Sequence, residues 1–300
     1  MTCVSVIIPT YDQPNELRRA LASAINQSHD KVEIIVVDDG SSDETQAVAK
    51  RAANSNESVT AQRHLRNRGG AAARNTGIAA ANGDVLAFLD SDDKWSETKI
   101  EQQLEYLIEQ EWDAVYCDYA YQRKGQFVSA RRILSQYLKS RSEEGKPEGG
   151  EELIAKILET KFDLGGSSTL MVRADIAQQV NGFDERFSRH QDWEFLIRVL
   201  KKGTIGYVDE QLVYKYETGR PDVEKIKAAK NLYFDKFDEE IDDAGEMGVR
   251  KQHNFQLSRC YLTQGKFISA LYWLLKSEVR LHEVPILFWL ILIGIKQRLQ

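Results

Sequence analysis

Cysteine, excess positive charge and long apolar runs are all scarce in this chain, and each scarcity excludes a class of protein. The 300 residues include three cysteines. Because these lie far apart and form no C-x-x-C pair, they argue against a disulfide framework or a zinc site. The net charge of -6 lacks the basic excess of a nucleic-acid-binding protein. The first residues, "MTCVSVIIPT", have neither the basic start nor the long apolar core of a signal peptide. We therefore expect a globular protein of the cytoplasm that has no nucleic-acid partner.

The most hydrophobic stretch, "VPILFWLILIGI" at residues 284–295, is too short to span a bilayer. A spanning helix needs roughly 20 apolar residues, whereas a run of roughly 10–14 is more often a core helix or an interfacial segment. Trp289 lies within the run, and Lys296 and Arg298 follow it, as in helices that lie among lipid headgroups. Two interpretations stay open: a helix packed on the protein's own body, or peripheral contact with the cytoplasmic face of a membrane.

Short β-branched runs alternate with helical stretches over the first part of the chain. The predicted strands lie at residues 4–10, 32–39, 59–65 and 84–90, and an Ala-rich helix is predicted at 70–81. Apolar runs of this length between helices are typical of buried parallel strands in βαβ units. The predicted fold class is therefore α/β, with a Rossmann-like, mostly parallel sheet flanked by helices. Ligands of such sheets bind at the carboxyl ends of the strands.

Carboxylates gather at those strand ends. The segment "VLAFLDSDDKW" places Asp90, Asp92 and Asp93 directly after a buried run, and Asp38 and Asp39 end an earlier strand. Like charges this close raise one another's pKa values unless a cation or several hydrogen-bond donors lie nearby. From the residues alone, the cluster is either a solvated acidic patch or a site for something positive.

Five segments follow one another in the order "VSVIIPTYDQPNELRRALASAINQ", "IIVVDDGSSDET", "NRGGAAARNTGIAAANGDVLAFLDSDD", "VNGFDERF" and "QDWEFLIRV". This succession resembles the motifs of family 2 glycosyltransferases over residues 4–216. The resemblance implies a GT-A fold over residues 1–220, in which residues 1–120 bind the nucleotide-sugar and residues 121–220 supply the acceptor site and the catalytic base. Residues 221–300 lie outside the resemblance, and their periodicity predicts a helical C-terminal region.

The resemblance also implies a set of donor-binding residues at the strand ends. They are Pro9, Thr10, Tyr11, Asp38, Asp39, Arg74, Asp90 and Ser91. A carboxylate such as Asp38 can accept a hydrogen bond from uracil N3–H, and the guanidinium of Arg74 suits a diphosphate. Plainer interpretations stay open, because "DDGSSDET" is also typical of a helix N-terminus and Arg74 of a solvated surface.

The stretch "DSD" at residues 90–92 resembles the family's D-x-D motif, which holds ribose and a divalent metal. We expect Asp92 to be the principal ligand of Mn²⁺ or Mg²⁺, because these hard cations take oxygen ligands. Asp90 is expected to bind either the metal or the ribose. Asp93 is expected either to support the metal ligands without binding the metal itself or to cap the next helix.

The segment "HQDWEFLIRV" resembles the family's acidic motif, which implies that Asp192 is the catalytic base. Such a base takes the proton of the acceptor hydroxyl as that hydroxyl attacks the sugar. Glu194 is the fallback for this role. Trp193 is expected either to line the acceptor pocket or to be a core aromatic residue.

The activity that the resemblance implies is an inverting, divalent-metal-dependent transfer from a nucleotide-sugar, with UDP-sugars favoured, to a glycan or lipid-linked glycan. The Q-x-x-R-W signature of processive members is absent from the sequence, which favours transfer of a single sugar. Two alternatives remain: a non-catalytic scaffold or binding protein with the same fold, and a sugar nucleotidyltransferase. A dinucleotide-dependent oxidoreductase is disfavoured, because no G-x-G-x-x-G follows the first strand.

Overall fold

A computed structural model describes residues 2–122, 147–216, 222–277, 287 and 291. Contacts divide the chain into two units. Among the described residues, the first unit comprises 2–122, 147–153 and 163–216, and the second comprises 154–162 and the residues from 222 onward. The second unit thus includes a short segment from the middle of the chain. The predicted boundary near residue 220 stays a prediction.

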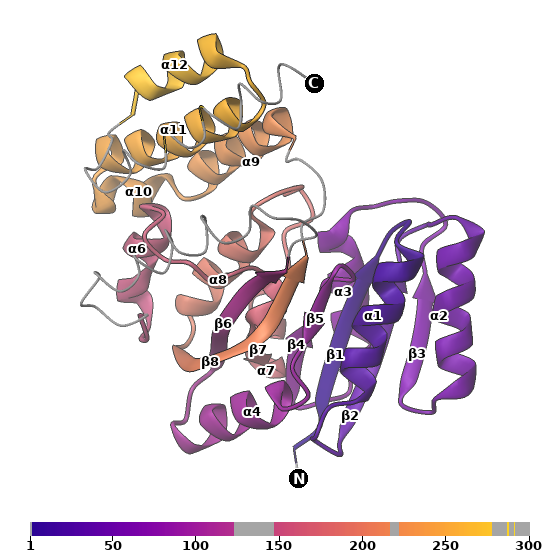
Figure 1. The fold of residues 1–300 in the computed structure, drawn as a ribbon. Helices are drawn as coiled ribbons and strands as arrows, with labels where there is room; N and C mark the ends of the chain where they lie inside the picture. Colours follow the sequence, from indigo (N-terminus) through magenta and orange to yellow (C-terminus); the bar gives the residue numbers. More distant parts are fainter. Residues whose placement is uncertain (1, 123–146, 217–221, 278–286, 288–290, 292–300) are drawn as a thin grey trace. The chain divides into compact units, whose positions relative to one another are not determined.

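Eight strands of the described residues form one mixed sheet in the first unit (Figure 1). They are β1 (Val4–Thr10), β2 (Val32–Asp38), β3 (Val59–Arg63), β4 (Val85–Phe88), β5 (Asp93–Trp95), β6 (Ala114–Gln122), β7 (Met171–Arg173) and β8 (Ile205–Tyr216). Their order across the sheet is β3-β2-β1-β4-β7-β6-β8-β5. The strands from β3 to β4 are parallel neighbours, whereas β7 runs antiparallel to both of its neighbours. The carboxyl ends of β1, β2 and β4 therefore lie together.

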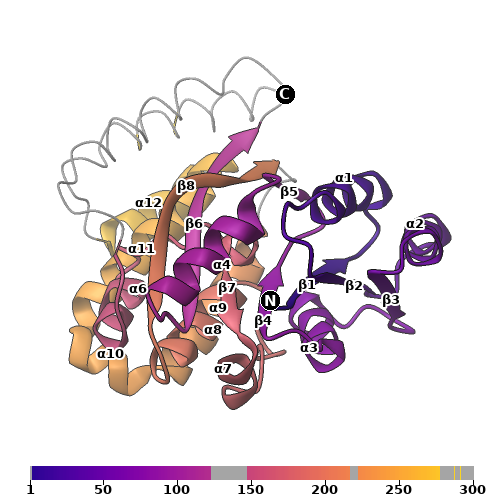
Figure 2. The same ribbon diagram turned by 90° about the horizontal axis from the view of Figure 1, so that it is seen from below.

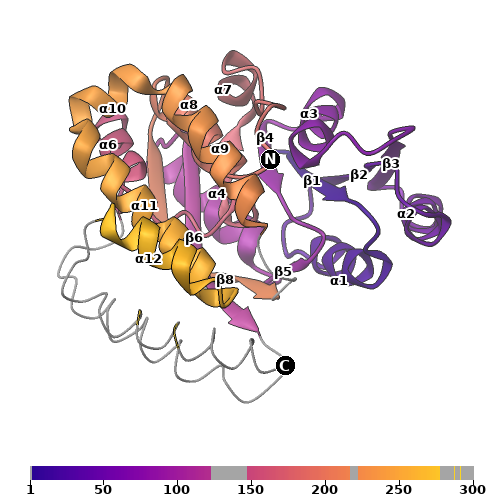
Figure 3. The same ribbon diagram turned by 90° about the horizontal axis from the view of Figure 1, so that it is seen from above.

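Helices cover both faces of this sheet (Figures 2 and 3). In the first unit they are α1 (Pro14–Ile25), α2 (Asp43–Ser55), α3 (Gly70–Ala80), α4 (Lys99–Glu109), α7 (Ala174–Gln179) and α8 (Gln191–Leu200), with 3₁₀ turns η1 (Glu151–Leu153) and η2 (Ser167–Thr169). Val6, Ile8 and Val36 share a core cluster with residues of α1, α2 and α4. Ile35 and Val37 pack with α3 instead. All seven residues of β1 are buried, as expected of a strand that is covered on both faces.

Helix α3 approaches β1 closely because Gly77 has no side chain. A Cβ atom at Gly77 would lie 2.4 Å from Cγ2 of Ile7, which is closer than non-bonded atoms pack in proteins. Arg74 lies about one turn earlier on the same helix and reaches Asp90, which follows β4. The close packing of α3 therefore brings a guanidinium to the carboxyl ends of the strands.

Three phenylalanines fix α8 against the end of β4. The ring of Phe195 on α8 stacks on Phe183, with centroids 4.2 Å apart. Phe88, the last residue of β4, meets both rings edge-on, at 5.1 Å from Phe183 and 6.0 Å from Phe195. Edge-to-face and stacked pairs of this kind are favourable geometries for aromatic side chains. The first turn of α8 is thereby held beside the segment that follows β4.

Helices also make up the regular structure of the second unit. They are α6 (Ile154–Leu158), α9 (Val223–Lys236), α10 (Asp238–Ala244), α11 (Glu246–Thr263) and α12 (Phe267–Leu275). Apolar residues of α9, α11 and α12 form one core, whose buried members are Val223, Ile226, Leu257, Tyr261, Leu262 and Ala270. These helices confirm the predicted helical C-terminal region.

A chain of polar side chains crosses the interior of the second unit. Nε2 of His253 donates a hydrogen bond to the carbonyl oxygen of Leu158 at 2.9 Å, because a carbonyl can only accept. Nζ of Lys230 donates to Nδ1 of His253 at 2.8 Å and to Oε1 of Gln256 at 2.7 Å. Burial lowers the pKa of Lys230 to about 7. These hydrogen bonds connect α6, α9 and α11.

The predicted interfacial segment at residues 284–295 lies outside the described residues, apart from Leu287 and Ile291. Leu287 packs against the core of the second unit. Within the described parts of the chain, no helix combines the length and the apolar character needed to cross a membrane.

Candidate active site

The end of β1 carries the first three predicted donor-binding residues. Pro9 and Thr10 are buried at the last two positions of the strand, and Tyr11 follows with 47% of its surface exposed. The hydroxyl Oγ1 of Thr10 is buried and has no hydrogen-bond partner in the described part of the chain. Buried hydroxyls are normally hydrogen-bonded, so this one is a candidate contact for a ligand.

Asp38 is the register partner of Thr10 at the end of β2. Its Oδ1 accepts a hydrogen bond from the backbone N–H of Ser41 at 2.9 Å. Its Oδ2 lies 3.4 Å from Nε of Arg63 and, among the described residues, accepts no hydrogen bond although it is buried. Two adjacent strand ends thus present a hydroxyl and a carboxylate oxygen with hydrogen-bonding capacity to spare.

Asp39, the next residue, is held by a loop of the chain itself. Its Oδ1 accepts from the backbone N–H of Arg68 at 2.8 Å and lies 2.7 Å from Nδ1 of His64. Its Oδ2 accepts from the backbone N–H of Gly69 at 2.7 Å. These bonds fix the loop before α3 against the sheet. The donor-binding role predicted for Asp39 stays a prediction.

Arg74 joins three elements of the site. It is buried on α3, so the alternative of a solvated surface residue was wrong. Its Nη2 donates to Oδ1 of Asp90 at 2.5 Å and to Oγ of Ser167 at 3.0 Å, and its Nη1 donates to Oε1 of Gln191 at 2.7 Å. One guanidinium therefore connects the end of β4, the turn η2 and the start of α8.

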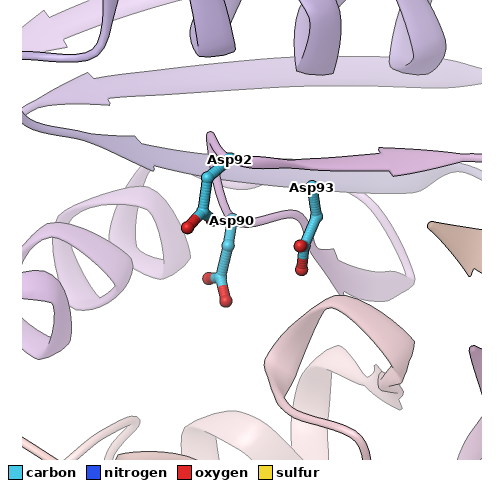
Figure 4. A group of neighbouring side chains, drawn as sticks. All are labelled: Asp90, Asp92 and Asp93. Carbon is cyan, nitrogen blue, oxygen red and sulfur yellow. The ribbon is translucent and has the colours of Figure 1, made fainter. Parts of the chain in front are cut away.

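Asp90, Asp92 and Asp93 extend their carboxylates to the same side of the segment that follows β4 (Figure 4). One carboxylate oxygen of each lies within 4.8 Å of those of the other two. Asp93 is buried, and Asp90 and Asp92 are partly exposed. Asp93 is not a helix cap, because α4 has Thr98 in that position. The three acids therefore form one compact cluster.

Basic and hydroxyl groups surround this cluster. Oδ2 of Asp93 accepts from Oγ of Ser168 at 2.6 Å and lies 3.3 Å from Nζ of Lys215. Burial, followed by the charges of Asp90 and Asp92, raises the pKa of Asp93 to about 7 against the opposing charge of Lys215. Burial acts on Asp90 in the same direction, but Arg74 and Lys215 outweigh it and hold the pKa of Asp90 below its ordinary value.

The chemistry of the cluster fits a divalent metal. Three carboxylates offer the oxygen ligands that Mg²⁺ and Mn²⁺ prefer, and these ions need one or two from the protein. Arg74 and Lys215 supply two positive charges against three carboxylates. Burial is the main cause of the raised pKa of Asp93, and the charges of Asp90 and Asp92 add to it. A divalent cation bound beside the three carboxylates would offset their mutual repulsion.

Helix α1 holds the backbone of this acidic segment. The hydroxyl of Ser91 donates to Oε1 of Gln13 at 2.5 Å. Nη2 of Arg19 donates to the carbonyl oxygen of Asp92 at 2.6 Å, and its guanidinium lies 3.5 Å from the ring centroid of Tyr216. The contact of Ser91 is thus with the protein, and its predicted donor-binding role stays a prediction.

Asp192 lies in the first turn of α8, close to a glycine that could not carry a side chain without meeting Lys215. A Cβ atom at Gly166 would lie 2.7 Å from Nζ of Lys215 and 3.9 Å from Oδ2 of Asp192. The bare backbone of Gly166 thus lies beside an amine and a carboxylate at once. Burial raises the pKa of Asp192 above its ordinary value, although the charges of Lys215 and Arg74 act to lower it. A raised pKa makes a carboxylate a stronger base.

The other two members of the acidic motif have different surroundings. Glu194 is fully buried in a two-pronged ion pair with Arg198, at 2.5 and 2.7 Å. That pairing gives Glu194 a structural role, so it loses support as the fallback base. Trp193 is partly exposed and stacks on His190 with ring centroids 4.5 Å apart. Its predicted acceptor role stays a prediction.

Sequence reasoning missed Lys215, Ser167 and Ser168. Nζ of Lys215 donates to the carbonyl oxygen of Gly165 at 2.7 Å besides its ion pair with Asp93. No local pattern in "LVYKY" marks a lysine that meets a segment more than a hundred residues earlier. The serines follow Gly165 and Gly166, whose φ values of +78° and +94° glycine adopts readily. The segment "GGSS" at residues 165–168 was therefore the sequence signal for a tight turn that carries these two serines.

A family model described as "Glycosyl transferase family 2" matches residues 5–178 of the chain. The match covers more than half of the sequence. The chain therefore belongs to glycosyl transferase family 2, as its ordered motifs predicted. Asp192 and Lys215 lie beyond the matched residues, so their place in the site rests on the geometry above.

Two relatives are named for roles in biosynthesis. The amylovoran biosynthesis glycosyltransferase AmsB of Erwinia amylovora is 31% identical over 207 residues, which cover 66% of this chain and 64% of that protein. The putative teichuronic acid biosynthesis glycosyltransferase TuaG of Bacillus subtilis (strain 168) is 28% identical over 233 residues, which cover 77% of this chain and 86% of that protein. The chain thus spans less than two thirds of the length of AmsB.

Solved structures share the fold at low sequence identity. TarS of S. aureus covers 98% of this chain with a TM-score of 0.60 and 19% identity, over 54% of the TarS chain. Residues 1–349 of TarS in complex with UDP give a TM-score of 0.57 at 19% identity, over 98% of this chain and 88% of that one. The mannosyltransferase PcManGT of Pyrobaculum calidifontis, in complex with GDP-Man and Mn²⁺, gives a TM-score of 0.62 at 15% identity. The match covers 99% of this chain and 85% of that one. The predicted α/β fold of the GT-A type is confirmed.

Proposed function

We propose that this chain transfers a single sugar from a UDP-sugar to a glycan or lipid-linked glycan, with inversion at the anomeric carbon. One observation supports this most: donor-side groups at the ends of β1, β2 and β4 lie beside the partly exposed carboxylate of Asp192 on α8, and Arg74 and Lys215 connect the two sides. The relatives named for amylovoran and teichuronic acid biosynthesis favour a glycan acceptor.

The nucleotide of the donor is assigned to the ends of β1 and β2. Oδ2 of Asp38 is the acceptor for uracil N3–H, and the hydroxyl of Thr10 bonds the base or the ribose. The exposed ring of Tyr11 follows the same strand end and offers a surface for the base. The TarS complex with UDP has the same fold, which favours UDP as the carrier.

The metal is assigned to Asp92 and Asp90. When bound there, Mn²⁺ or Mg²⁺ neutralises the charge of the diphosphate leaving group. Asp92 is the principal ligand in this proposal and Asp90 the second, because the resemblance to the D-x-D motif implies these roles and both carboxylates belong to the cluster. The Mn²⁺ in the PcManGT complex supports a divalent ion in a protein of this fold.

The base is assigned to Asp192. Its raised pKa suits a group that takes a proton from the acceptor hydroxyl. The stacking of Phe195 and the bond between Arg74 and Gln191 hold the first turn of α8 in place. Lys215 and Asp192 both lie close to Gly166, so the carboxylate and the amine approach the same point of the site. A base that deprotonates the acceptor hydroxyl on the face of the sugar opposite the leaving UDP gives inversion in a single displacement.

A panel of nucleotide-sugars tests the proposal. UDP-sugars with Mn²⁺ are expected to raise the thermal unfolding midpoint, because a ligand that binds the folded state stabilises it. Excess chelator, or the replacement Asp92→Asn, should remove most of this shift, whereas Glu97→Gln, an exposed acid nearby, should not. The proposal is wrong if no nucleotide-sugar shifts the midpoint or if chelator has no effect.

The same panel separates the two alternatives. A transferase releases UDP from the donor as sugar moves to the acceptor or to water, whereas a nucleotidyltransferase supplied with pyrophosphate would convert the UDP-sugar to UTP and sugar 1-phosphate. A non-catalytic scaffold binds donor and releases neither. The cytoplasmic location and the membrane contact through residues 284–295 remain predictions that this panel does not address.

A further inference from the structure

Helix α12 turns an unbroken apolar stripe outward. The exposed fractions are 90% for Ile268, 56% for Leu271, 50% for Tyr272 and 79% for Leu275. Positions three, four and seven apart lie on one face of a helix, so the four side chains form a single row. None of the nine residues of α12 is charged. An exposed helix face is normally polar, and this one is apolar along its whole length.

The other face of α12 fixes the helix to the second unit. Ala270 is buried, and Phe267 and Trp273 pack against the core formed with α9 and α11. The stripe is therefore held outward by a packed helix, not by a loose end. Contiguous exposed apolar surface of this kind marks a site that binds another protein or a membrane.

Lysines border the stripe. Lys266 directly precedes α12 and Lys276 directly follows it, and both are exposed. Nζ of Lys276 donates to the hydroxyl of Tyr272 at 2.5 Å and lies 4.3 Å from the ring centroid. An apolar row with cations and aromatic rings at its borders is the pattern of a helix that lies in the headgroup region of a membrane.

We propose that α12 is a docking surface for an anionic lipid bilayer. Its four exposed apolar side chains would reach the acyl boundary, and the exposed Lys266 and Lys276 would lie among anionic headgroups. A second copy of the chain is a poorer occupant, because antiparallel pairing of two α12 helices would bring Lys266 of one against Lys276 of the other. Anionic headgroups complement the same lysines.

Vesicle sedimentation tests the docking surface with the full chain and without donor or acceptor. The chain should bind vesicles of phosphatidylcholine and phosphatidylglycerol, and bind pure phosphatidylcholine or high-salt samples more weakly, because screening weakens the lysine contacts. No binding to the anionic vesicles would overturn the proposal. The assay needs no turnover, so its failure is independent of any failure of the proposed transferase activity.

A double replacement assigns the binding to α12. Ile268→Ser with Leu275→Ser removes the two most exposed members of the stripe and should weaken vesicle binding by about tenfold or more. Because both side chains are exposed, the unfolding midpoint should not change. Leu65→Ser, at a fully exposed leucine of the first unit, is the matched control and should bind as the wild type does. Equal binding by the double variant and the wild type would overturn the proposal.

Deletion of residues 278–300 separates α12 from the predicted interfacial segment. Binding that survives the deletion and is lost in the double variant supports α12. If the deletion abolishes vesicle binding and the double variant binds normally, the assignment to α12 is wrong. Residues 284–295 would then be the segment that contacts the membrane. A dimer of the wild type in solution that the double variant abolishes also overturns it, because a second copy would then be the occupant.

Discussion

Asp38 and Asp39 are adjacent residues with the same side chain and different surroundings. Backbone N–H groups donate hydrogen bonds to both carboxylate oxygens of Asp39. Oδ2 of Asp38, in contrast, accepts no hydrogen bond from the described residues. Two identical adjacent residues therefore have different hydrogen-bond surroundings in this structure. We assign Asp39 to holding the loop before α3 and Asp38 to the nucleotide.

Replacing each residue of this pair by asparagine distinguishes the two functions. Asp38→Asn should weaken UDP affinity by about 10- to 100-fold, because a hydrogen bond to a charged acceptor is lost, and should leave the unfolding midpoint nearly unchanged. Asp39→Asn should lower the midpoint, since an amide replaces one oxygen that accepts from the loop. Calorimetric UDP titration and thermal unfolding measure both effects. Equal losses of affinity and stability in the two variants would contradict the assignment.

The charge of Lys215 sets the basicity of Asp192 in this account. Burial raises the pKa of Asp192 and Lys215 opposes it. The base works when it is deprotonated, so kcat/KM falls as the pH drops through this pKa. Lys215→Met removes the opposing charge and should move the acidic limb of the pH profile to higher pH. Lys94→Met, at an exposed lysine of β5, should leave the limb in place. An unmoved limb in Lys215→Met, or one at lower pH, would contradict this coupling.

At the scale of elements, the strands and helices with local patterns were predictable. Residues 4–10 and 70–81 were predicted almost as the structure has β1 and α3, because burial on two faces and an Ala-rich stretch leave local signatures. The insertion of β7 between β4 and β6 was not predictable, and neither was the position of α8 beside the end of β4. They depend on contacts such as Phe88 with Phe195, which lie far apart in sequence. Asp38, Asp39 and Asp90 to Asp93 were found because they follow local strands, and Asp192 because its segment resembles a family motif. Lys215 was missed because it has neither signal.

The buried Lys230 makes the stability of the second unit depend on pH. Its pKa is lowered to about 7 in the folded chain, against about 10.4 when unfolded. Between these values the unfolded state binds one more proton, so stability rises with pH by up to about 1.4 kcal/mol per unit. Lys230→Met should flatten this rise, and Lys225→Met, at an exposed lysine on the same helix, should not. Denaturant unfolding at pH 7 and pH 9 measures the difference. An unchanged slope in Lys230→Met would show that the amine is not the titrating group.

At the scale of the molecule, the first unit holds the candidate site and the second unit holds the proposed lipid contact. Every residue assigned here to donor, metal or base belongs to the first unit. The apolar stripe of α12 belongs to the second. If both assignments hold, the chain joins a sugar-transferring unit to one that binds a membrane surface, where a lipid-linked acceptor would be found.

The most direct test of the central claim is UDP release from the bound UDP-sugar by the wild type and by Asp192→Asn, with donor affinity measured alongside. Asparagine keeps the shape of the side chain and removes the basic oxygen. The account predicts that turnover falls by about 10²- to 10⁴-fold, the usual contribution of a general base, while donor affinity is unchanged. Turnover close to that of the wild type, or loss of donor affinity together with turnover, would contradict the claim that Asp192 is the base of this site.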